Sequence, residues 1–464
     1  MRIAVIGADA ESVHTIEKAH ELGHEVVTVD IDPDAPGAML ADTSLQCDIS
    51  HEREVIDLLK KENIDLVCTT PIGRHLVTIG AVNDALGLPG VTRERAETCI
   101  DKYAFHTRLR NVRLRTGHCY MIGEDHPVNA EDIAYPAVFK PRYGSHGRSV
   151  HYLQSSDELK KLWAEIWQQS KDKADDTDTP GAEEGSVKTK AGDIPADSLA
   201  ADTGDDTADK DHNLAAARFR AVLKETMEKQ RKKESGEDDP HEEYILEDAI
   251  PGTEYAVDGI VEGCNFNPVL IRRKTITCPP SRQAVSYMTL IPGDNPRAEV
   301  QIREYMSKLC EVLGLTECML HADVSIQGRT VNCIELSPSP AGRHVYDEFI
   351  PMTTGVDIAE QYLRYMAGGS HNFQPLFHKR MVLGYFGMEN CFVHGIPSEK
   401  DVRDALPEGV KLRKWICNIR MLDYLARITD ENSILSRGCY IIEGNNEREL
   451  TRCIDIIRDL FALE

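Results

Sequence analysis

A lysine beside closely spaced glycines is the first pattern in this chain that could carry chemistry. Lys140 ends an apolar run that begins at Tyr135, and Gly144, Ser145 and Gly147 follow shortly after it. Glycines permit a turn whose backbone N–H groups approach phosphate oxygens closely. A lysine on an apolar strand is costly to bury unless its ammonium meets an anion or reaches solvent. The pattern favours a phosphate-binding loop, but not a Walker-type loop, because no G-x-x-x-x-G-K-[ST] occurs in the chain.

Four carboxylates further along the chain are the second pattern. Glu247 and Glu254 stand on either side of a Pro-Gly turn, while Asp323 and Glu335 stand on two predicted strands with mostly apolar neighbours. Two carboxylates in such surroundings repel each other unless a cation lies between them. Mg²⁺ is usually held by one or two carboxylates together with substrate phosphates. Asp323 and Glu335 therefore predict a magnesium site, with a solvent-exposed strand face as the alternative.

Taken in order, these stretches resemble the ATP-grasp superfamily, carboxylate-amine ligase type, over most of the chain. The resemblance implies a phosphate site, an adenine and ribose strand, and a pair of metal ligands for Mg²⁺ or Mn²⁺. It assigns Lys102, Lys140, Gly144, Ser145 and Gly147 to the phosphates of ATP, Glu247, Asp248 and Ala249 to the adenine, Glu254 to the ribose, and Asp323 and Glu335 to the metal.

The third motif departs from the family pattern at three positions. Asp323 replaces the first Glu, Ser337 stands where members often have an Asn, and Ser339 stands where they have an Arg. That Arg normally neutralises charge on the transferred phosphoryl group, an effect that commonly contributes about 3 kcal/mol or more. Lys274 resembles a further basic residue of the family site. Arg343 is one candidate to replace the missing Arg, and Arg272 or Arg273 on the neighbouring strand is the other.

The elements that must position these residues begin with a β-α-β unit. An apolar run at 2–7, a helical pattern at 11–22 and a second apolar run at 25–31 predict a parallel sheet. The unit could suggest a nicotinamide-dependent dehydrogenase. However, the first turn lacks the second and third glycines of G-x-G-x-x-G, so a structural or substrate-side role is favoured over dinucleotide binding.

The predicted architecture is an α/β ATP-grasp fold in three parts. Residues 1–100 form an N-terminal Rossmann-like domain, 101–370 the ATP-grasp core with a lid at about 135–255, and 371–464 a small C-terminal α/β domain. The layout of this last part resembles the C-terminal domain of ATP-grasp amino-acid ligases. Residues 171–212 carry thirteen acidic and five basic side chains and predict a disordered insertion in the lid. A solvated tether is the main interpretation of the insertion, and docking of a partner is the alternative.

Composition limits the class of protein. The chain has 464 residues, 41% hydrophobic residues and a net charge of −24, which argues against a general nucleic-acid binder. Its thirteen cysteines are dispersed, without metal-binding spacing. The first residues predict a strand rather than a signal peptide, and no apolar run is long enough to span a membrane. A cytoplasmic setting is expected.

The resemblance implies an ATP-dependent ligase. Such an enzyme activates a carboxylate as an acyl phosphate and couples it to an amine, releasing ADP and phosphate. Lys274, Arg343 and Arg273 are the predicted catalytic residues, and small-molecule acids and amines are the expected partners. Relatives are often homodimers, but the sequence leaves assembly open. A bicarbonate-activating enzyme like biotin carboxylase and a degenerate nucleotide-binding scaffold remain the alternatives.

Overall fold

The computed structural model describes residues 1–123, 126–144, 147–176, 243–279 and 281–464, with side chains described up to residue 166 and again from 243. Two compact units are present: Met1–Leu159 together with Glu243–Glu464, and Lys160–Glu242. Most of the predicted acidic insertion and the helix expected near Asn213 lie outside the described residues. Everything that follows concerns the first unit, except helix α6, which continues into the second.

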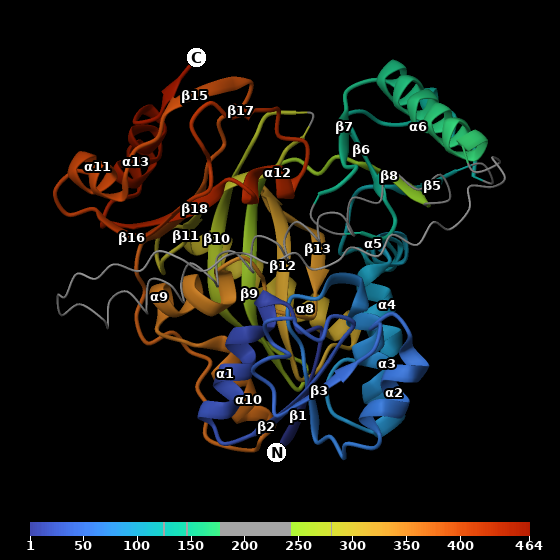
Figure 1. Cartoon of the computed structure of the whole chain (residues 1–464). Coiled ribbons are helices and arrows are strands. Elements are labelled where there is room, and N and C mark those ends of the chain that lie inside the picture. Colours follow the sequence, from blue (N-terminus) through green and yellow to red (C-terminus); the bar gives the residue numbers. More distant parts are fainter. Residues whose placement is uncertain (124–125, 145–146, 177–242, 280) are drawn as a thin grey trace, which may run out of the picture. The chain divides into compact units, whose positions relative to one another are not determined.

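The N-terminal region is a parallel sheet with helices around it, as predicted (Figure 1). The strand order is β3-β2-β1-β4, and the three neighbouring pairs are parallel. The strands are short; β1, β2 and β4 are largely buried because their runs are apolar, whereas β3 is more exposed. They are β1 Arg2–Ile6, β2 Glu25–Asp30, β3 Thr43–Gln46 and β4 Leu66–Cys68, and the helices are α1 Val13–Glu21, α2 Glu52–Leu59, α3 Leu76–Leu86 and α4 Arg93–Ile100.

The first turn of this sheet is covered by the chain itself. The Ala8 N–H donates to Asp30 at 2.7 Å, and the Gly37 N–H donates to the Ala8 carbonyl at 2.8 Å. A Cβ atom added to Gly37 would lie 2.3 Å from Ser12 Oγ. The segment around Gly37 therefore packs on the turn where a dinucleotide pyrophosphate would approach. This packing agrees with the structural role that the sequence favoured.

A second, four-stranded sheet carries the glycine loop. Its order is β5-β8-β6-β7, and all three pairs are antiparallel. The glycine loop joins β6 to β7. The strand after the loop, β7, begins at His151, slightly later than the sequence pattern indicated. The elements are α5 Lys102–Asn111, β5 Cys119–Ile122, β6 Ala137–Pro141, β7 His151–Leu153, α6 Ser156–Asp176 and β8 Tyr244–Asp248.

An eight-stranded antiparallel sheet forms the centre of the first unit (Figure 1). Its order is β13-β12-β9-β10-β11-β14-β18-β16. Helix α8 begins at Pro296 behind an Asn295 cap and packs its apolar face into the same core as β9 and β12. The strands are β9 Thr253–Glu262, β10 Asn265–Ile276, β11 Ala284–Thr289, β12 Cys318–Gln327, β13 Thr330–Ser337, β14 Met381–Tyr385, β16 Lys411–Cys417 and β18 Gly438–Glu443.

The C-terminal segment contributes three strands to this central sheet, through the pairing of β14 with β11. It also builds a small sheet in the order β17-β15-β19. The 371–464 part thus extends the sheet of the core and also forms a small sheet of its own. The remaining elements are α8 Pro296–Leu313, a π-helix at Val345–Phe349, α9 Ile350–Thr354, α10 Ile358–Met366, β15 Cys391–Gly395, α11 Glu399–Ala405, β17 Tyr424–Leu425, α12 Glu431–Leu435, α13 Glu447–Asp459 and β19 Ala462–Leu463.

In the described part of the chain, three 3-10 helices complete the connections: Ala10–Ser12, Gly73–His75 and Ala130–Asp132. In the part of the chain that the structure describes, no helix is both long enough and apolar enough to cross a membrane.

Candidate functional site

Glu247 lies at the centre of a buried group of basic side chains. Strand β8 pairs with β6, so Glu247 comes within reach of Lys140, whose Nζ is 2.6 Å from Glu247 Oε1. Arg115 and His106 reach its other oxygen at 2.7 and 3.0 Å. Burial raises the pKa of Glu247, but Lys140, His106 and Arg115 outweigh it and hold that pKa well below its usual range. Glu247 is therefore ionised and fixed.

The partner of Lys140 differs from the one predicted. The sequence pointed to a phosphate, whereas in this structure the buried ammonium meets Glu247. A carboxylate satisfies the same electrostatic need that the burial of a lysine creates. The burial of Lys140 therefore does not by itself show a phosphate site.

Lys102 reaches the glycine loop. Its Nζ donates to the Gly144 carbonyl at 2.7 Å. Gly144 and Gly147 have φ values of 142° and 64°, which side-chain-bearing residues rarely adopt. A Cβ atom at Gly147 would also lie 2.7 Å from the Gln283 amide. The structure thus brings Lys102, Gly144 and Gly147 into one loop region, while Ser145 lies outside the described residues.

The backbone at Asp248 and Ala249 is already hydrogen-bonded. The Asp248 N–H donates to the His118 carbonyl at 3.1 Å, and the Ala249 N–H donates to the Pro136 carbonyl at 3.0 Å. The Asp248 carboxylate accepts from the His118 N–H at 2.9 Å. These N–H groups are therefore not available to an adenine ring, which is a correction to the predicted role of the two residues. Only carbonyl oxygens there could face a ligand.

Asp323 and Glu335 are direct cross-strand partners on β12 and β13. Directly opposed residues in an antiparallel pair project from the same face of the sheet. Asp323 is buried and Glu335 is exposed. The two carboxylates thus lie together, as the metal prediction required.

Lys274 pairs with Asp323 through one carboxylate oxygen and lies 3.9 Å from Glu254 Oε2. The other oxygen, Asp323 Oδ1, is buried without a hydrogen-bond partner. A buried anionic oxygen without a donor is unfavourable. The site therefore fits a divalent cation, which would satisfy that oxygen. Glu254, the predicted ribose ligand, is also held by Arg282 at 2.6 Å.

Successive side chains of a strand point to opposite faces of the sheet, so Arg272 and Arg273 of β10 lie on different faces. Arg272 is buried against Asp258, with its Nη2 2.6 Å from Oδ2, and His321 Nδ1 donates to the other oxygen, Oδ1, at 2.8 Å. Arg273 projects from the opposite face and pairs with Glu447 at 2.6 Å. The structure therefore does not bring Arg273 to Asp323, so its predicted catalytic role is not supported.

Arg343 lies where the loop after β13 meets the N-terminal region. Its backbone N–H donates to both Glu11 oxygens, at 3.0 and 3.1 Å, and its Nη2 donates to Asn432 at 3.2 Å. Burial raises the pKa of Glu11 to about 7, with a contribution from Asp9. Ser337 and Ser339, which replace the family's Asn and Arg, share a hydrogen bond of 2.7 Å. Arg343 thus faces Glu11 and α12.

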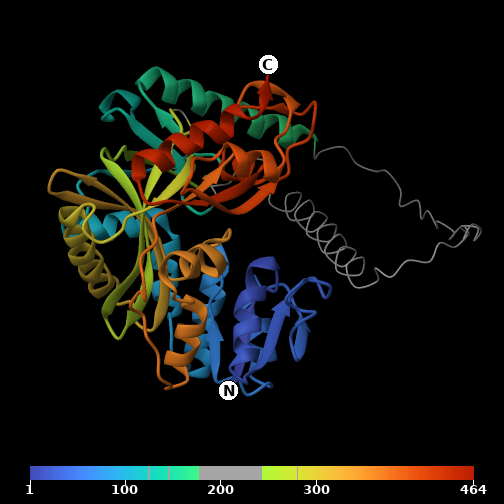
Figure 2. The same cartoon turned by 90° about the vertical axis from the view of Figure 1, so that its left-hand side faces the viewer.

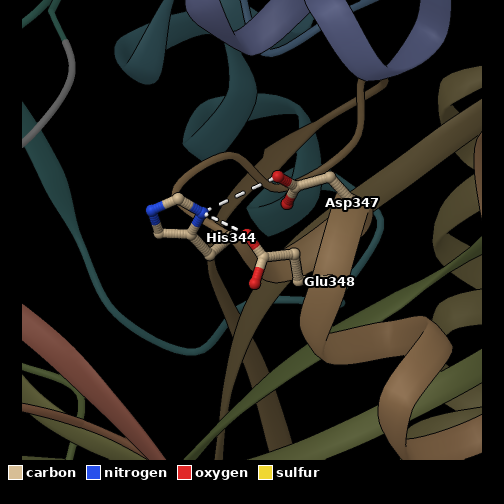
Figure 3. A group of neighbouring side chains, drawn as sticks. All are labelled: His344, Asp347 and Glu348. Atoms are coloured by element: carbon tan, nitrogen blue, oxygen red, sulfur yellow. Dashed lines mark ion pairs between the residues drawn. The ribbon is translucent and has the colours of Figure 1, made fainter. Parts of the chain in front are cut away.

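The next turn holds a compact ion-pair network (Figure 3). His344 Nδ1 lies 3.0 Å from Glu348 Oε1 and 3.7 Å from Asp347 Oδ2. Burial lowers the pKa of His344, but the two carboxylates raise it overall to about 9. Lys414 of β16 also pairs with Glu348. Two cations balance two anions, so the network ties the π-helix to the C-terminal strands without needing a metal.

Several site residues had no signal in the sequence. His106 and Arg115 reach Glu247 from outside its strand, Arg282 reaches Glu254 across a turn, and Glu431 lies near Arg343 and Lys274 from far along the chain. Each contact depends on which strands and loops are neighbours in space. Spacing along the chain does not encode that information.

A family model described as "ATP-grasp domain" matches residues 203–347. Two curated proteins are similar over about a third of the chain. The carbamoyl phosphate synthase large chain of Neisseria meningitidis serogroup B is 26% identical over 166 residues, covering 34% of this chain and 15% of that protein. The formate-dependent phosphoribosylglycinamide formyltransferase of Sulfurovum sp. is 23% identical over 180 residues, covering 35% and 43%. The matches therefore span less than half of either relative.

Solved structures match the whole chain. The L-amino acid ligase from Bacillus licheniformis has a TM-score of 0.67 and 13% identity, with 100% of this chain and 98% of that chain covered. The biotin carboxylase domain of the Hydrogenobacter thermophilus 2-oxoglutarate carboxylase, solved with MgADP and bicarbonate, has a TM-score of 0.58 and 12% identity, covering 100% and 90%. At these identities the likeness shows the fold.

Proposed function

We propose that this chain, which the ATP-grasp domain model matches over residues 203–347, is an ADP-forming ligase of the ATP-grasp superfamily that couples a carboxylic acid to an amine. The members of this superfamily that it resembles in fold include the ligase and the carboxylase named above. The proposal goes further than the fold, since it names the reaction type. It rests on the side chains that this chain itself brings together.

The observation that carries the proposal is the convergence of Lys274, Asp323, Glu335 and Glu254 on one face of the central sheet. Asp323 and Glu335 are cross-strand partners, and Lys274 reaches both Asp323 and Glu254. Burial lowers the pKa of Lys274, but Asp323, Tyr287 and Glu254 outweigh it and raise that pKa above its ordinary value. Lys274 therefore keeps its positive charge at any working pH, as a phosphoryl-transfer site needs.

The same geometry suggests where ATP and a metal would bind. Asp323 and Glu335 would hold Mg²⁺ or Mn²⁺, which supplies charge neutralisation on the phosphates. Lys102 and the glycine loop would contact phosphate oxygens, and Glu254 would bind the ribose. Lys140 and Glu247 would line the adenine end of the site. These assignments remain proposals.

The proposed reaction has two steps. A substrate carboxylate oxygen attacks the γ-phosphorus of ATP, the bond to the bridging oxygen breaks, and ADP leaves. An amine nitrogen then forms a bond to the acyl carbon, the C–O bond to phosphate breaks with its electron pair, and the nitrogen loses a proton. Lys274 stabilises the negative charge that the first step moves, and the fold holds the reactants in position.

The test is ADP release with Mg²⁺-ATP against pooled carboxylic acids and amines, with hydroxylamine present to trap an acyl phosphate as a hydroxamate. The expected result is ADP release that depends on one acid pool and yields hydroxamate. Lys274→Met should lower this rate by about 100-fold or more, since one charge-stabilising group is commonly worth that much. ATP turnover that requires bicarbonate instead would favour the carboxylase alternative.

A second candidate function is nucleotide binding without turnover. The hydrogen bond between Ser337 and Ser339 favours it, because these hydroxyls replace an amide and a guanidinium of the family pattern. Under this function ATP binds, measured by calorimetry, but no acid pool stimulates ADP release.

A further inference from the structure

Glu431 is a carboxylate of the C-terminal segment that lies near the loop after β13. It is the first residue of α12, a short helix whose start is fixed by Asp430 and Ser433, each of which caps the other. The next residue, Asn432, accepts a hydrogen bond from Arg343 at 3.2 Å. This bond ties α12 to the loop that follows the metal strand β13. The local structure therefore holds Glu431 in a defined place.

The charged neighbours of Glu431 come from the reaction centre. Arg343, Lys274, Asp323 and His321 all act on its carboxylate electrostatically. Glu431 in turn acts on Tyr287, which is the cross-strand partner of Lys274 on β11. Glu431 thus lies over the face of the central sheet that carries Lys274 and Asp323.

Glu431 differs from the other carboxylates around it. Asp323 has Lys274, Glu254 has Arg282, and Asp258 has Arg272 and His321. Glu431 makes no hydrogen bond or ion pair with any residue that the structure describes, and burial raises its pKa. The nearby cations have closer partners, since Lys274 pairs with Asp323 and Arg343 donates to Asn432.

A half-buried carboxylate that no donor of the chain engages can accept hydrogen bonds from a ligand that brings N–H groups. In the proposed ligase, the substrate that brings N–H groups to the acyl carbon is the amine. We propose that Glu431 receives this amine: its carboxylate accepts a hydrogen bond from the attacking nitrogen and takes the proton that the nitrogen loses as the amide forms. This inference rests on the proposed ligase function.

The step is balanced as follows. The nitrogen lone pair forms the bond to the acyl carbon, and the C–O bond to phosphate breaks, with its electron pair leaving on the phosphate. The proton passes from nitrogen to Glu431 and then to water, so the carboxylate is regenerated. No oxidant or further reactant is needed. Proton transfer to a positioned side chain contributes about 100-fold to 10,000-fold to a rate.

The test compares two nucleophiles in Glu431→Gln. Hydroxylamine is largely unprotonated at neutral pH and attacks acyl phosphates without help from a base. An ordinary amine lacks this reactivity: its ammonium form first loses one proton to solvent, and the attacking nitrogen then needs a group to accept a second proton as the amide forms. We expect amide formation to fall about 100-fold or more, while acid-dependent hydroxamate formation falls by a far smaller factor. Glu431→Asp should recover part of the amide rate.

The matched control is Glu408→Gln, an exposed glutamate of the same segment, which should behave as the parent in both assays. Equal losses with both nucleophiles, or an unchanged amide rate, would overturn the role of Glu431. If Glu431→Gln does not fold, as judged by its melting temperature, Glu431→Asp decides the matter by the same ratio of amide to hydroxamate. A parent protein that forms no hydroxamate with any acid overturns the ligase function itself, and this role with it.

Discussion

At the scale of single residues, Glu247 shows how one carboxylate can hold two cations and a neutral histidine in a buried site. Lys140, Arg115 and His106 all contact it, and burial lowers the pKa of His106 to about 4, so that His106 is neutral near pH 7. Glu247→Gln would leave Lys140 and Arg115 buried without an anion. We expect it to lower the free energy of unfolding by about 3 to 5 kcal/mol, measured by urea denaturation.

The control for this prediction is Glu243→Gln. Glu243 pairs with Arg142 at 2.9 Å, but half of its side chain is exposed. Exposed ion pairs contribute about 0 to 1 kcal/mol, so this variant should unfold close to the parent. Equal losses of unfolding free energy in the two variants would contradict the role assigned to the burial of Glu247.

At the scale of elements, the network of His344, Glu348 and Lys414 joins the π-helix to β16. The pKa of His344 is raised to about 9 from a reference of 6.5, so its contribution to stability is fully present below pH 6.5 and is lost as pH rises through 9. The carboxylates of Asp347 and Glu348 raise the pKa of His344, whereas burial lowers it. His344→Gln should therefore lower the melting temperature at pH 6.5, and the difference from the parent should shrink above pH 9.

The contribution of Glu348 to stability depends on pH in the opposite direction. Burial raises the pKa of Glu348, but His344 and Lys414 outweigh it and lower that pKa to about 2, so its contribution is present above pH 4.5 and is lost as pH falls through 2.

The control for His344→Gln is His378→Gln, at an exposed histidine without such partners among the described residues. A difference between His344→Gln and the parent that stays constant from pH 6.5 to beyond 9 would contradict the assigned role.

At the scale of the whole first unit, the C-terminal segment completes the central sheet. Strand β14 pairs with β11, and Met381, Leu383 and Ile441 share one core with Ile260 and Val269. Removal of residues 371–464 would expose the β11 edge and part of that core. Exposed sheet edges promote association with other chains, so we expect the 1–370 fragment to aggregate, measured by gel filtration. A monomeric, folded 1–370 fragment would show instead that the segment is an independent domain.

The sequence by itself determined the elements and the order of the motifs. The predicted parallel unit at the N-terminus is confirmed, with strands at Arg2–Ile6 and Glu25–Asp30. Asp323 and Glu335 also lie together on one face, as expected. Apolar periodicity and turn residues act locally, so a strand forms where its own residues favour it. The resemblance to the superfamily rests on the same local patterns.

Only the tertiary structure decided which side chains meet. It gave Lys140 a carboxylate partner, turned Arg273 away from Asp323, engaged the N–H groups of Asp248 and Ala249, and brought Glu431 to Lys274 from far along the chain. It also joined the C-terminal strands to the core sheet. Such contacts depend on which strands pair and which faces pack. Distant parts of the chain settle that pairing together, through burial and charge, and no local window of sequence contains it.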